Sequence, residues 1–258
     1  MPYDPNKKYY ETEGVPEYEG QDTGLLKAEE VILSSLRDEI KDKPILDLGV
    51  GAGRTTPYLR AISKHYIGAD YSAKMIDLCR ERNSEATLVV CDAREMPMFE
   101  DETFAAVLFL GAGMGAAIPP GRSRVLKEVY RVLTSDGVFV FPAQNIEDKD
   151  VYSFSGFSPA PRPVAYIKDN ATRLKAYTAA QIIRLWNRVH QKGYAVVPEY
   201  DYVTGEILPL YYISKDAQVK QLLSAGFRRV EAFDMEGIPI NGAKQVKDYW
   251  VYYIARKQ

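Results

Sequence analysis

The chain has 258 residues, 46% of them hydrophobic, and a formal net charge of −2 from 33 basic and 35 acidic side chains. This length suits one α/β domain with an insertion, and the hydrophobic content allows a full core. The balanced charge, without a polybasic run, argues against a nucleic-acid partner. The only cysteines, Cys79 and Cys91, have neither metal-ligand nor disulfide-framework spacing. We therefore expect no metal site and a reducing compartment.

Residues 1–22 are polar and rich in Tyr, Pro and Gly, and we interpret them as an arm or a short irregular helix. They lack the apolar core of a signal peptide, and no apolar run in the chain is long enough to cross a bilayer. We therefore expect a cytoplasmic protein without a membrane partner. Asp22 and Thr23 resemble a helix cap, and apolar residues at helical spacing follow from Leu25 to Ile40.

A short buried strand, Ile45–Leu48, runs into a glycine-rich turn and then a helix over residues 55–63. The turn has the spacing Gly-x-Gly-x-Gly, which differs from the Gly-x-Gly-x-x-Gly of dinucleotide folds. Glycines at Gly49, Gly51 and Gly53 allow a tight turn and a close approach of a ligand to the backbone. The Asp47 carboxylate would repel a pyrophosphate and would suit a ligand that carries an ammonium group.

The next two predicted strands also end in acids. Asp70 ends the strand at residues 65–69, about 20 residues after the glycine turn, where a carboxylate commonly holds a ribose diol. The alternative role, as a cap for the next helix, is already filled by Ser72. Tyr71 can pack on an adenine ring. Asp92 follows the strand at residues 86–91.

These features together resemble the class I S-adenosylmethionine (SAM) dependent methyltransferases, whose first motif is acidic-x-Gly-x-Gly-x-Gly. The resemblance implies SAM as cofactor and S-adenosylhomocysteine (SAH) as product. It also places Met75 against the adenine, with plain core packing as the alternative, and has the adenine amino group read by the Asp92 side chain or by the adjacent N–H. We therefore expect these residues to bind the cofactor: Asp47, Gly49, Gly51, Gly53, Asp70, Tyr71, Met75, Asp92, Ala93, Arg94 and Gly111.

The fourth predicted strand covers residues 104–110 and runs into a loop of small residues at 111–116. At the switch point of a doubly wound sheet, this loop should lie beside the reactive group of the ligand. A helix over residues 124–133, a turn at Ser135-Asp136-Gly137 and a fifth strand at 138–141 follow.

Residues 143–213 depart from the alternation of strands and helices. We predict a helix from about residue 178 to 191, then a hairpin of residues 195–203 and 206–213 that turns at Thr204-Gly205. We interpret this insertion as an acceptor-binding cap, with a structural or dimer-forming role as the alternative. In the resembled family the N-terminal segment folds over the cofactor as a lid; the alternative is surface coil. Candidate acceptor-binding residues are Tyr10, Tyr18, Met114, Gln144, Asn145, Tyr152, Tyr211 and Tyr212.

Ser214 is expected to cap a last helix that carries Val219, Leu222 and Leu223 and ends at Gly226. Strands six and seven follow at residues 227–233 and 248–256. The predicted fold is a doubly wound, Rossmann-like α/β sheet of seven strands, mostly parallel with one antiparallel strand, plus an α+β cap insertion. Its expected parts are an arm at 1–22, a core at 23–142 and 214–258, and a cap at 143–213.

The predicted activity is transfer of a methyl group from SAM to an O or N atom of a small molecule, an enzyme of EC class 2.1.1. The donor is already activated, so alignment of the two reactants is the main catalytic device. His190 is the candidate general base, and a packed helix residue is the alternative. The competing interpretations are an RNA or protein methyltransferase, and a SAM-binding protein that transfers no methyl group. The sequence leaves monomer and homodimer open.

Overall fold

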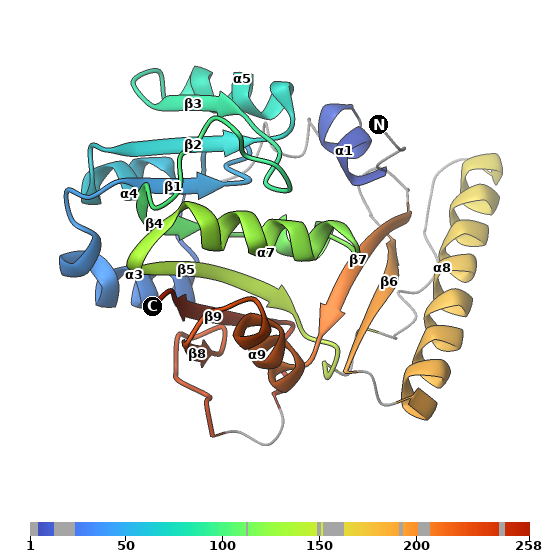
Figure 1. Cartoon of the computed structure of the whole chain (residues 1–258). Helices are drawn as coiled ribbons and strands as arrows, with labels where there is room; N and C mark the ends of the chain where they lie inside the picture. The colour runs from blue at the N-terminus through green and yellow to red at the C-terminus, as the bar shows by residue number, and fades with distance from the viewer. Residues whose placement is uncertain are drawn as a thin grey trace.

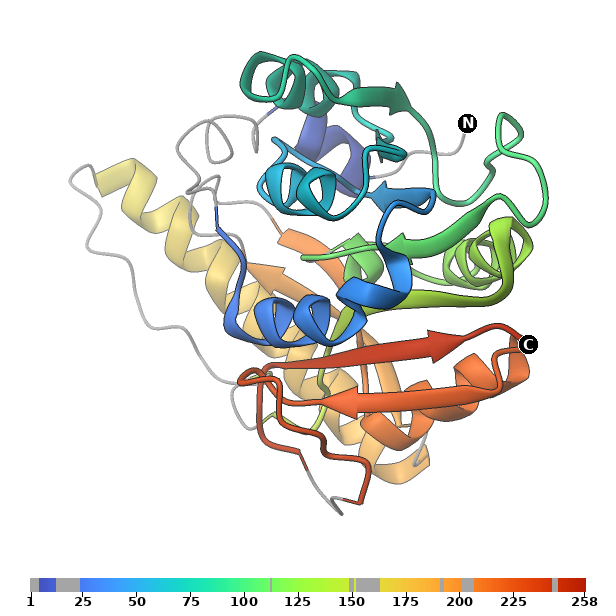
Figure 2. The ribbon, with the colours of Figure 1, turned by 90° about the vertical axis from the view of Figure 1, so that its left-hand side faces the viewer.

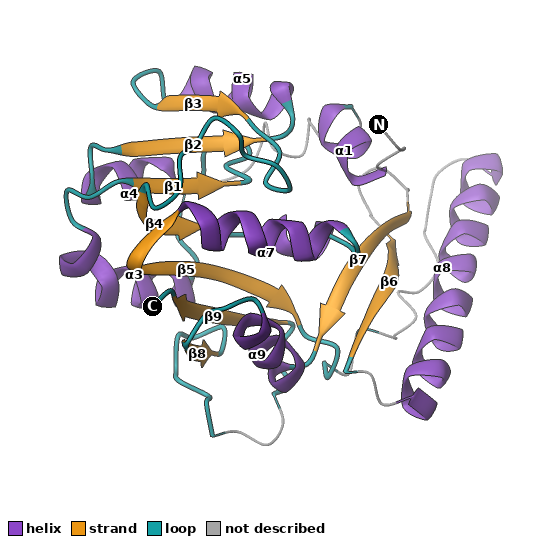
Figure 3. Cartoon of the chain, in the orientation of Figure 1, coloured by secondary structure: helices purple, strands orange, loops and turns teal. Residues whose placement is uncertain are grey.

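A computed structural model of the chain describes residues 5–12, 24–111, 113–148, 151, 163–190, 193–200, 207–242 and 246–258. Figure 1 labels the elements in chain order, and Figure 3 separates helices from strands. The helices are α1 (Pro5–Glu11), α3 (Lys27–Ile40), α4 (Thr56–Ile62), α5 (Ala73–Arg82), α6 (Gly113–Ala116), α7 (Gly121–Val132), α8 (Pro163–His190) and α9 (Lys215–Ser224). The strands are β1 (Ile45–Leu48), β2 (Tyr66–Asp70), β3 (Thr87–Val90), β4 (Phe104–Leu108), β5 (Leu133–Gln144), β6 (Tyr194–Tyr200), β7 (Ile207–Ile213), β8 (Arg229–Phe233) and β9 (Trp250–Arg256).

The sheet is doubly wound. Strands β3, β2, β1, β4 and β5 lie side by side in that order and run parallel to one another. Strand β9 is antiparallel to β5 over Val138–Gln144, and β8 is antiparallel to β9. The order β3-β2-β1-β4-β5-β9-β8, with β9 antiparallel to its neighbours, contains the seven predicted core strands; β7 and β6 join at the end of β5 and bring the described sheet to nine strands. Because the chain crosses from β3 back to β4, the switch point lies between β1 and β4.

Helices cover both faces of this sheet, and alternate side chains of each central strand pack into opposite layers. On β5, Phe139 and Phe141 belong to the cluster beneath α7 and α9, whereas Val138 and Val140 belong to the cluster beneath α3 and α4. Figure 1 shows α7 and α9 in front of the sheet, and Figure 2 shows α3 on its other side. Burial on both faces explains why these strands are almost continuously apolar.

The predicted hairpin is present, because β6 and β7 pair antiparallel, and β7 joins the end of β5 at Tyr212, opposite Gln144. Its turn, Thr204-Gly205, lies outside the described residues. Helix α8 stands beside β6 at the edge of the molecule (Figure 1). It begins at Pro163 instead of near residue 178, since proline is tolerated in the first turn of a helix. The boundaries of the arm, core and cap stay predictions.

Other element boundaries also differ from the sequence prediction. Helix α3 begins at Lys27, and the Glu29 carboxylate accepts a hydrogen bond from the Leu26 N–H at 2.8 Å; the expected cap, Asp22-Thr23, lies outside the described residues. Strand β5 begins at Leu133 and includes the predicted turn, with a register shift against β4 and a positive φ at Asp136. On α9, Leu222 is buried and Leu223 is exposed.

Within the described ranges, no helix is both long and apolar enough to span a membrane. The same residues contain no group of three His, Cys, Asp or Glu side chains that could hold a metal ion.

Candidate functional site

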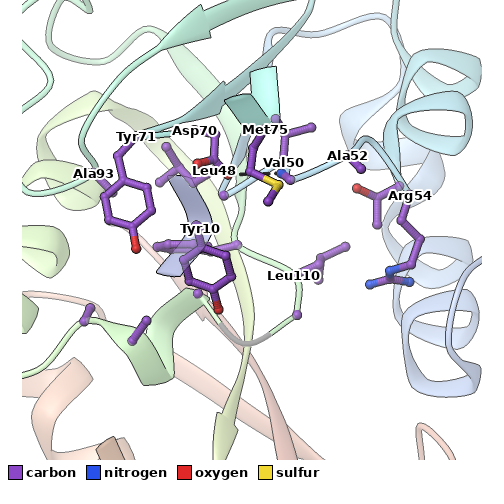
Figure 4. A pocket seen from close by; sticks show the side chains of 18 of the residues that line it. Tyr10, Leu48, Val50, Ala52, Arg54, Asp70, Tyr71, Met75, Ala93 and Leu110 are labelled. Atoms are coloured by element: carbon purple, nitrogen blue, oxygen red, sulfur yellow. Dashed lines mark hydrogen bonds between the residues drawn. The ribbon is translucent and has the colours of Figure 1, made fainter. Parts of the chain in front are cut away.

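A cavity of about 610 Å³ opens at the carboxyl ends of the parallel strands. This is the size and place expected for a ligand site in an open α/β sheet. Figure 4 shows Asp70, Tyr71 and Met75 along one side, Val50 and Ala52 beside them, and Arg54 at the far end. The side chains and backbone of these segments border it: Tyr10, residues 24–26, 48–52, 54, 55, 70, 71, 75, 91–94, 109–111, 113, 116, 117, 125 and Trp250.

The glycine turn lies against this cavity through Gly49 and Gly51, whose φ angles are 60° and 54°. Such angles favour glycine. A Cβ at Gly49 would also collide with the ring of Phe109. Gly53 does not border the cavity; a Cβ there would meet the side chains of Asn83 and Cys79. The first two glycines therefore shape the site, and the third lets the turn pack against the end of α5.

Asp70 is held at the cavity wall by the backbone. Its Oδ2 accepts a hydrogen bond from the Gly51 N–H at 3.1 Å, and its Oδ1 accepts one from the Ser72 N–H at 2.9 Å. Burial raises the pKa of Asp70 to about 6, although these N–H groups oppose the shift. The side chain is thus largely ionised at neutral pH, fixed in place, and retains lone pairs that can accept from a ligand.

Asp92 borders the cavity in a tight pair with Arg94. The Arg94 Nη2 lies 2.7 Å from Asp92 Oδ2, and the Arg94 Nε and backbone N–H each donate to Oδ1 at 2.9 Å. Burial alone would raise the pKa of Asp92, but the hydrogen bonds from Arg94 outweigh it and hold the pKa below its ordinary value. The pair leaves a fixed carboxylate beside Ala93, which also borders the cavity.

Asp47, in contrast, does not border the cavity. It is 1% exposed, and its Oδ2 accepts hydrogen bonds from the hydroxyls of Thr55 at 2.9 Å and Tyr66 at 3.0 Å. Burial raises its pKa to about 7. Asp47 thereby ties β1 to β2 and to the start of α4. Its contact with the ammonium group of a ligand stays a prediction.

Arg54 and Glu29 form an ion pair at the rim that the sequence interpretation missed. Arg54 Nη1 and Nη2 lie 2.7 and 2.8 Å from the two carboxylate oxygens of Glu29, whose side chain is fully buried. Arg54 Nη1 also donates to the carbonyl of Gly24 at 2.7 Å. The pair fixes the segment before α3 against the glycine turn. Nothing in the spacing of 25 residues signals it in the sequence.

Helix α1 lies over the same end of the sheet. The Tyr10 ring is 6.2 Å from that of Tyr71, and the Ser72 hydroxyl donates to the Tyr10 carbonyl at 2.8 Å. The Asn6 amide donates to the carbonyls of Ala116 and Pro209, both at 3.1 Å. The helix thus connects the edge of the cavity at β2 with α6 and β7.

Most predicted acceptor-binding residues do not reach the cavity. Tyr10 borders it, but the other described candidates serve inside the fold: Met114, Gln144, Asn145, Tyr211 and Tyr212. The Tyr212 hydroxyl donates to Glu199 at 2.8 Å, and the Asn145 amide donates to the backbone carbonyls of residues 246 and 248. These polar groups are buried and form hydrogen bonds within the chain, so they do not face the cavity.

The remaining candidates lie outside the described part of the chain. Tyr18 and Tyr152 fall in ranges that the structure does not describe, as does the side chain of His190, the last residue of α8. The role of His190 as a base stays a prediction.

Trp250 and the segment Phe109–Leu110 also border the cavity and were not predicted. Their positions follow from the topology. An antiparallel last strand begins where its parallel neighbour ends, and Trp250 pairs with Gln144, the last residue of β5. The position of Trp250 near the start of the predicted last strand was therefore a signal in the sequence that this residue borders the cavity.

The wall suits SAM better than a phosphorylated nucleotide. Asp70 and Asp92 offer carboxylate oxygens to hydroxyl or amino donors, and a phosphate would face both charges. The two arginines at the wall, Arg54 and Arg94, are paired with carboxylates. Beside Gly111, where φ is 83°, a Cβ would find nothing within 4 Å, so the backbone itself faces open space.

The comparisons with known proteins agree with this geometry. Residues 45–137 match the family described as "Methyltransferase domain". The human protein "Probable tRNA methyltransferase 9B" is 32% identical over 116 residues, which are 45% of this chain and 24% of that protein. "Demethylmenaquinone methyltransferase" of Thermotoga maritima is 32% identical over 104 residues, 40% of this chain and 44% of that protein.

The solved glycopeptide N-methyltransferase MtfA, complexed with SAH, has a TM-score of 0.57 at 15% identity, and the alignment covers 92% of each chain. Matches to the two curated relatives span about a quarter and under half of their lengths. Residues 45–137 thus carry a methyltransferase domain, and the fold of the chain is that of the class I SAM-dependent methyltransferases. The cofactor of that class is SAM.

Proposed function

We propose that this protein transfers a methyl group from SAM to an O or N atom of a small molecule. The observation that carries the proposal is one cavity that is bordered by Gly51, by the fixed Asp70 carboxylate and by the small residues after β4. The core at 23–142 and 214–258 would hold the cofactor, and the arm at 1–22 and the cap at 143–213 would close over it.

Each wall residue then has a defined task. Asp70 accepts hydrogen bonds from the ribose hydroxyls. At the edge of the adenine, the Asp92 carboxylate accepts a hydrogen bond or the neighbouring backbone N–H donates one. Tyr71 and Met75 pack against the base, while the backbone of Gly49 and Gly51 allows close approach. Arg54, fixed by Glu29, supplies a cation near the carboxylate of the amino-acid part. When bound, SAM supplies a methyl group already activated on a sulfonium.

The protein contributes alignment and exclusion of water. Among the described residues that border the cavity there is no His, Lys or Glu. A general base from His190 would have to come from the part of the cap that the structure does not describe. A hydroxyl that ionises by itself needs no such base.

A small acceptor is favoured over RNA because α1 lies across the cavity and because the chain has no basic excess, with a net charge of −2. The match to a tRNA methyltransferase makes RNA the alternative that the experiment must test. Both cysteines are buried and free, which supports the proposed cytoplasmic setting.

The test is calorimetric titration of the protein with SAM and SAH, with NADH as control. We expect micromolar binding of both SAM and SAH and none of NADH. The protein is then incubated with SAM that carries a labelled methyl group, in one series with small phenols and amines and in another with bulk tRNA. The incorporation of label into each acceptor is measured. Binding of NADH without SAM would overturn the proposal, and label in tRNA but in no small molecule would overturn its acceptor class.

A further inference from the structure

One part of the cavity wall is apolar, and we call it the apolar lobe. Its residues come from the segment before α3, the loop after β4, the end of α6 with its following residue, and the start of β9: Leu25, Leu26, Leu110, Ala116, Ala117 and Trp250. Leu25 and Trp250 pack against the same buried cluster that contains Leu110. Ala117 packs against the cluster that contains Phe109. Packing against two buried clusters holds the walls of the lobe in place.

Small residues leave room beside this lobe. Gly111 lies at the mouth of the loop after β4, and the space where its Cβ would point is open to 4 Å. At Gly113 a Cβ would run into the Phe109 ring, so the loop lies close against that ring. A ligand can therefore approach the backbone between the glycine turn and α6.

The lobe has no charge to offer. Arg54, paired with Glu29, faces the carboxylate of the cofactor in the proposed function, and Arg94 is paired with Asp92. The Thr55 hydroxyl donates to Asp47. A charged acceptor would lose its hydration here without gaining a partner, whereas an uncharged one would bury apolar surface. Aromatic rings at Trp250 and Tyr10 favour a flat partner.

We propose that the apolar lobe is the acceptor subsite and that its acceptor is an uncharged aromatic molecule with an acidic hydroxyl. This rests on the proposed function, since it names the substrate class of the same cavity. In the reaction an O–CH₃ bond forms and the S–CH₃ bond breaks, with its electron pair left on sulfur. The hydroxyl proton goes to solvent, which is consistent with a described wall that contains no His, Lys or Glu.

The experiment compares three probes that share one ring system and differ in charge: 2-naphthol, 2-naphthalenesulfonate and 2-naphthylmethylammonium. Each is titrated by calorimetry into the full chain saturated with SAH. We expect saturable binding of 2-naphthol at least tenfold tighter than that of either charged probe. With SAM in place of SAH, mass spectrometry should detect 2-methoxynaphthalene.

Variants locate the binding. Ala117→Asp places a charge in the lobe and should weaken 2-naphthol binding at least tenfold, with SAH affinity changed less than twofold. Ala117→Leu fills the lobe without a charge and should have the same effect on 2-naphthol. The matched control is Ala171→Asp on the exposed side of α8, away from the cavity, which should change neither affinity.

Two results would overturn the inference: a charged probe that binds as tightly as 2-naphthol, or no binding of 2-naphthol to a complex that has already bound SAH. Both leave the cofactor site standing. Failure of SAH itself to bind would instead refute the proposed function, so the two failures are distinguishable.

Discussion

The guanidinium of Arg122 lies over the ring of Tyr211, 4.4 Å from its centroid, in the interior of the protein. Arg122 is 1% exposed, and burial lowers its pKa to about 10, so it is a cation at neutral pH. It donates to the carbonyl of Met114 and to the side chains of Gln218 and Gln221. Within the described chain its hydrogen-bond partners include no carboxylate. One buried cation therefore joins α6, which borders the cavity, to β7 and α9.

Replacing this cation should loosen the junction. Arg122→Met removes the donor of three hydrogen bonds, and of their acceptors Gln221 Oε1 keeps another donor, the Gln218 amide. We expect the free energy of unfolding to fall by about 3 kcal/mol. Urea unfolding followed by circular dichroism measures it. Arg229→Met is the control, because the Arg229 side chain is 67% exposed, and its loss should cost less than about 0.5 kcal/mol. Equal stability of Arg122→Met and wild type would show that the buried cation does not stabilise this junction.

Asp70→Asn should weaken cofactor binding. The amide loses the charged acceptor, and its NH₂ group faces the N–H of Gly51 or Ser72 instead of accepting from it. We expect SAH affinity to fall by about 100-fold, equivalent to about 2.7 kcal/mol. Calorimetry measures the change, with Asp77→Asn on the exposed face of α5 as control. Unchanged affinity would rule out the ribose role.

The same carboxylate should make binding depend on pH. The pKa of Asp70 is raised to about 6, so below that pH the free protein carries a proton that ligand donors must displace. SAH affinity should fall as the pH is lowered from 7 toward 5, by up to about tenfold per unit. Titrations at several pH values give the slope, and the Asp70→Asn profile should lack this step. An identical step in both proteins would assign it to another group.

Asp47 should influence stability rather than the affinity profile. Its folded-state pKa is about 7, against about 3.9 in the unfolded chain. Between these pH values the folded protein binds a proton at Asp47 that the unfolded chain does not bind. The resulting contribution of Asp47 to the free energy of unfolding is therefore complete below about pH 4 and is lost as the pH rises through about 7. The free energy of unfolding of wild type minus that of Asp47→Asn should therefore decrease across this range.

Urea unfolding at a series of pH values checks this difference, with Asp38→Asn, on the exposed side of α3, as the control variant. A difference that grew with pH would contradict the assignment, because it would require a folded-state pKa below that of the unfolded chain.

Two neighbouring glutamates on α3 allow a buried ion pair to be compared with a surface ion pair. Glu29 has a fully buried side chain paired with Arg54, whereas the Glu30 side chain is 54% exposed and lies 3.5 Å from Lys27. We expect Glu29→Gln to cost about 3 kcal/mol of unfolding free energy and to weaken SAH binding, because Arg54 loses its anchor. Glu30→Gln should cost less than about 0.5 kcal/mol.

Thermal and urea unfolding, with SAH calorimetry on the same samples, measure both variants. Equal effects of the two substitutions would show that burial of the Glu29–Arg54 pair is of no consequence for the site.

Much of the fold was readable from the sequence, because the signals were local. Short apolar runs bounded by Gly, Pro and acidic residues fixed the order of strands, and Ser72 and Ser214 cap α5 and α9 as predicted, each accepting from the N–H three residues on. The positive φ angles at Gly49 and Gly51 follow the same logic, since a tight turn after a buried strand leaves few alternatives to glycine.

The cavity was readable only in part. Asp70 reaches the wall because parallel strands end at one edge, a rule that needs no knowledge of packing. Asp47 has a similar place in the sequence but turns toward Thr55 and Tyr66, and only the packing of β1 against β2 and α4 decides that.

The sequence by itself thus determined the order of the core strands along the chain, the glycine turn and the carboxylate at the end of β2, since each depends on residues near one another in the chain. The tertiary structure alone decided which distant residues meet: Glu29 with Arg54, Arg122 with Tyr211, and Trp250 at the cavity. It also turned the hairpin tyrosines Tyr211 and Tyr212 into the interior. The physical reason is that burial selects partners by distance in space, and a pattern along the chain carries no measure of that distance.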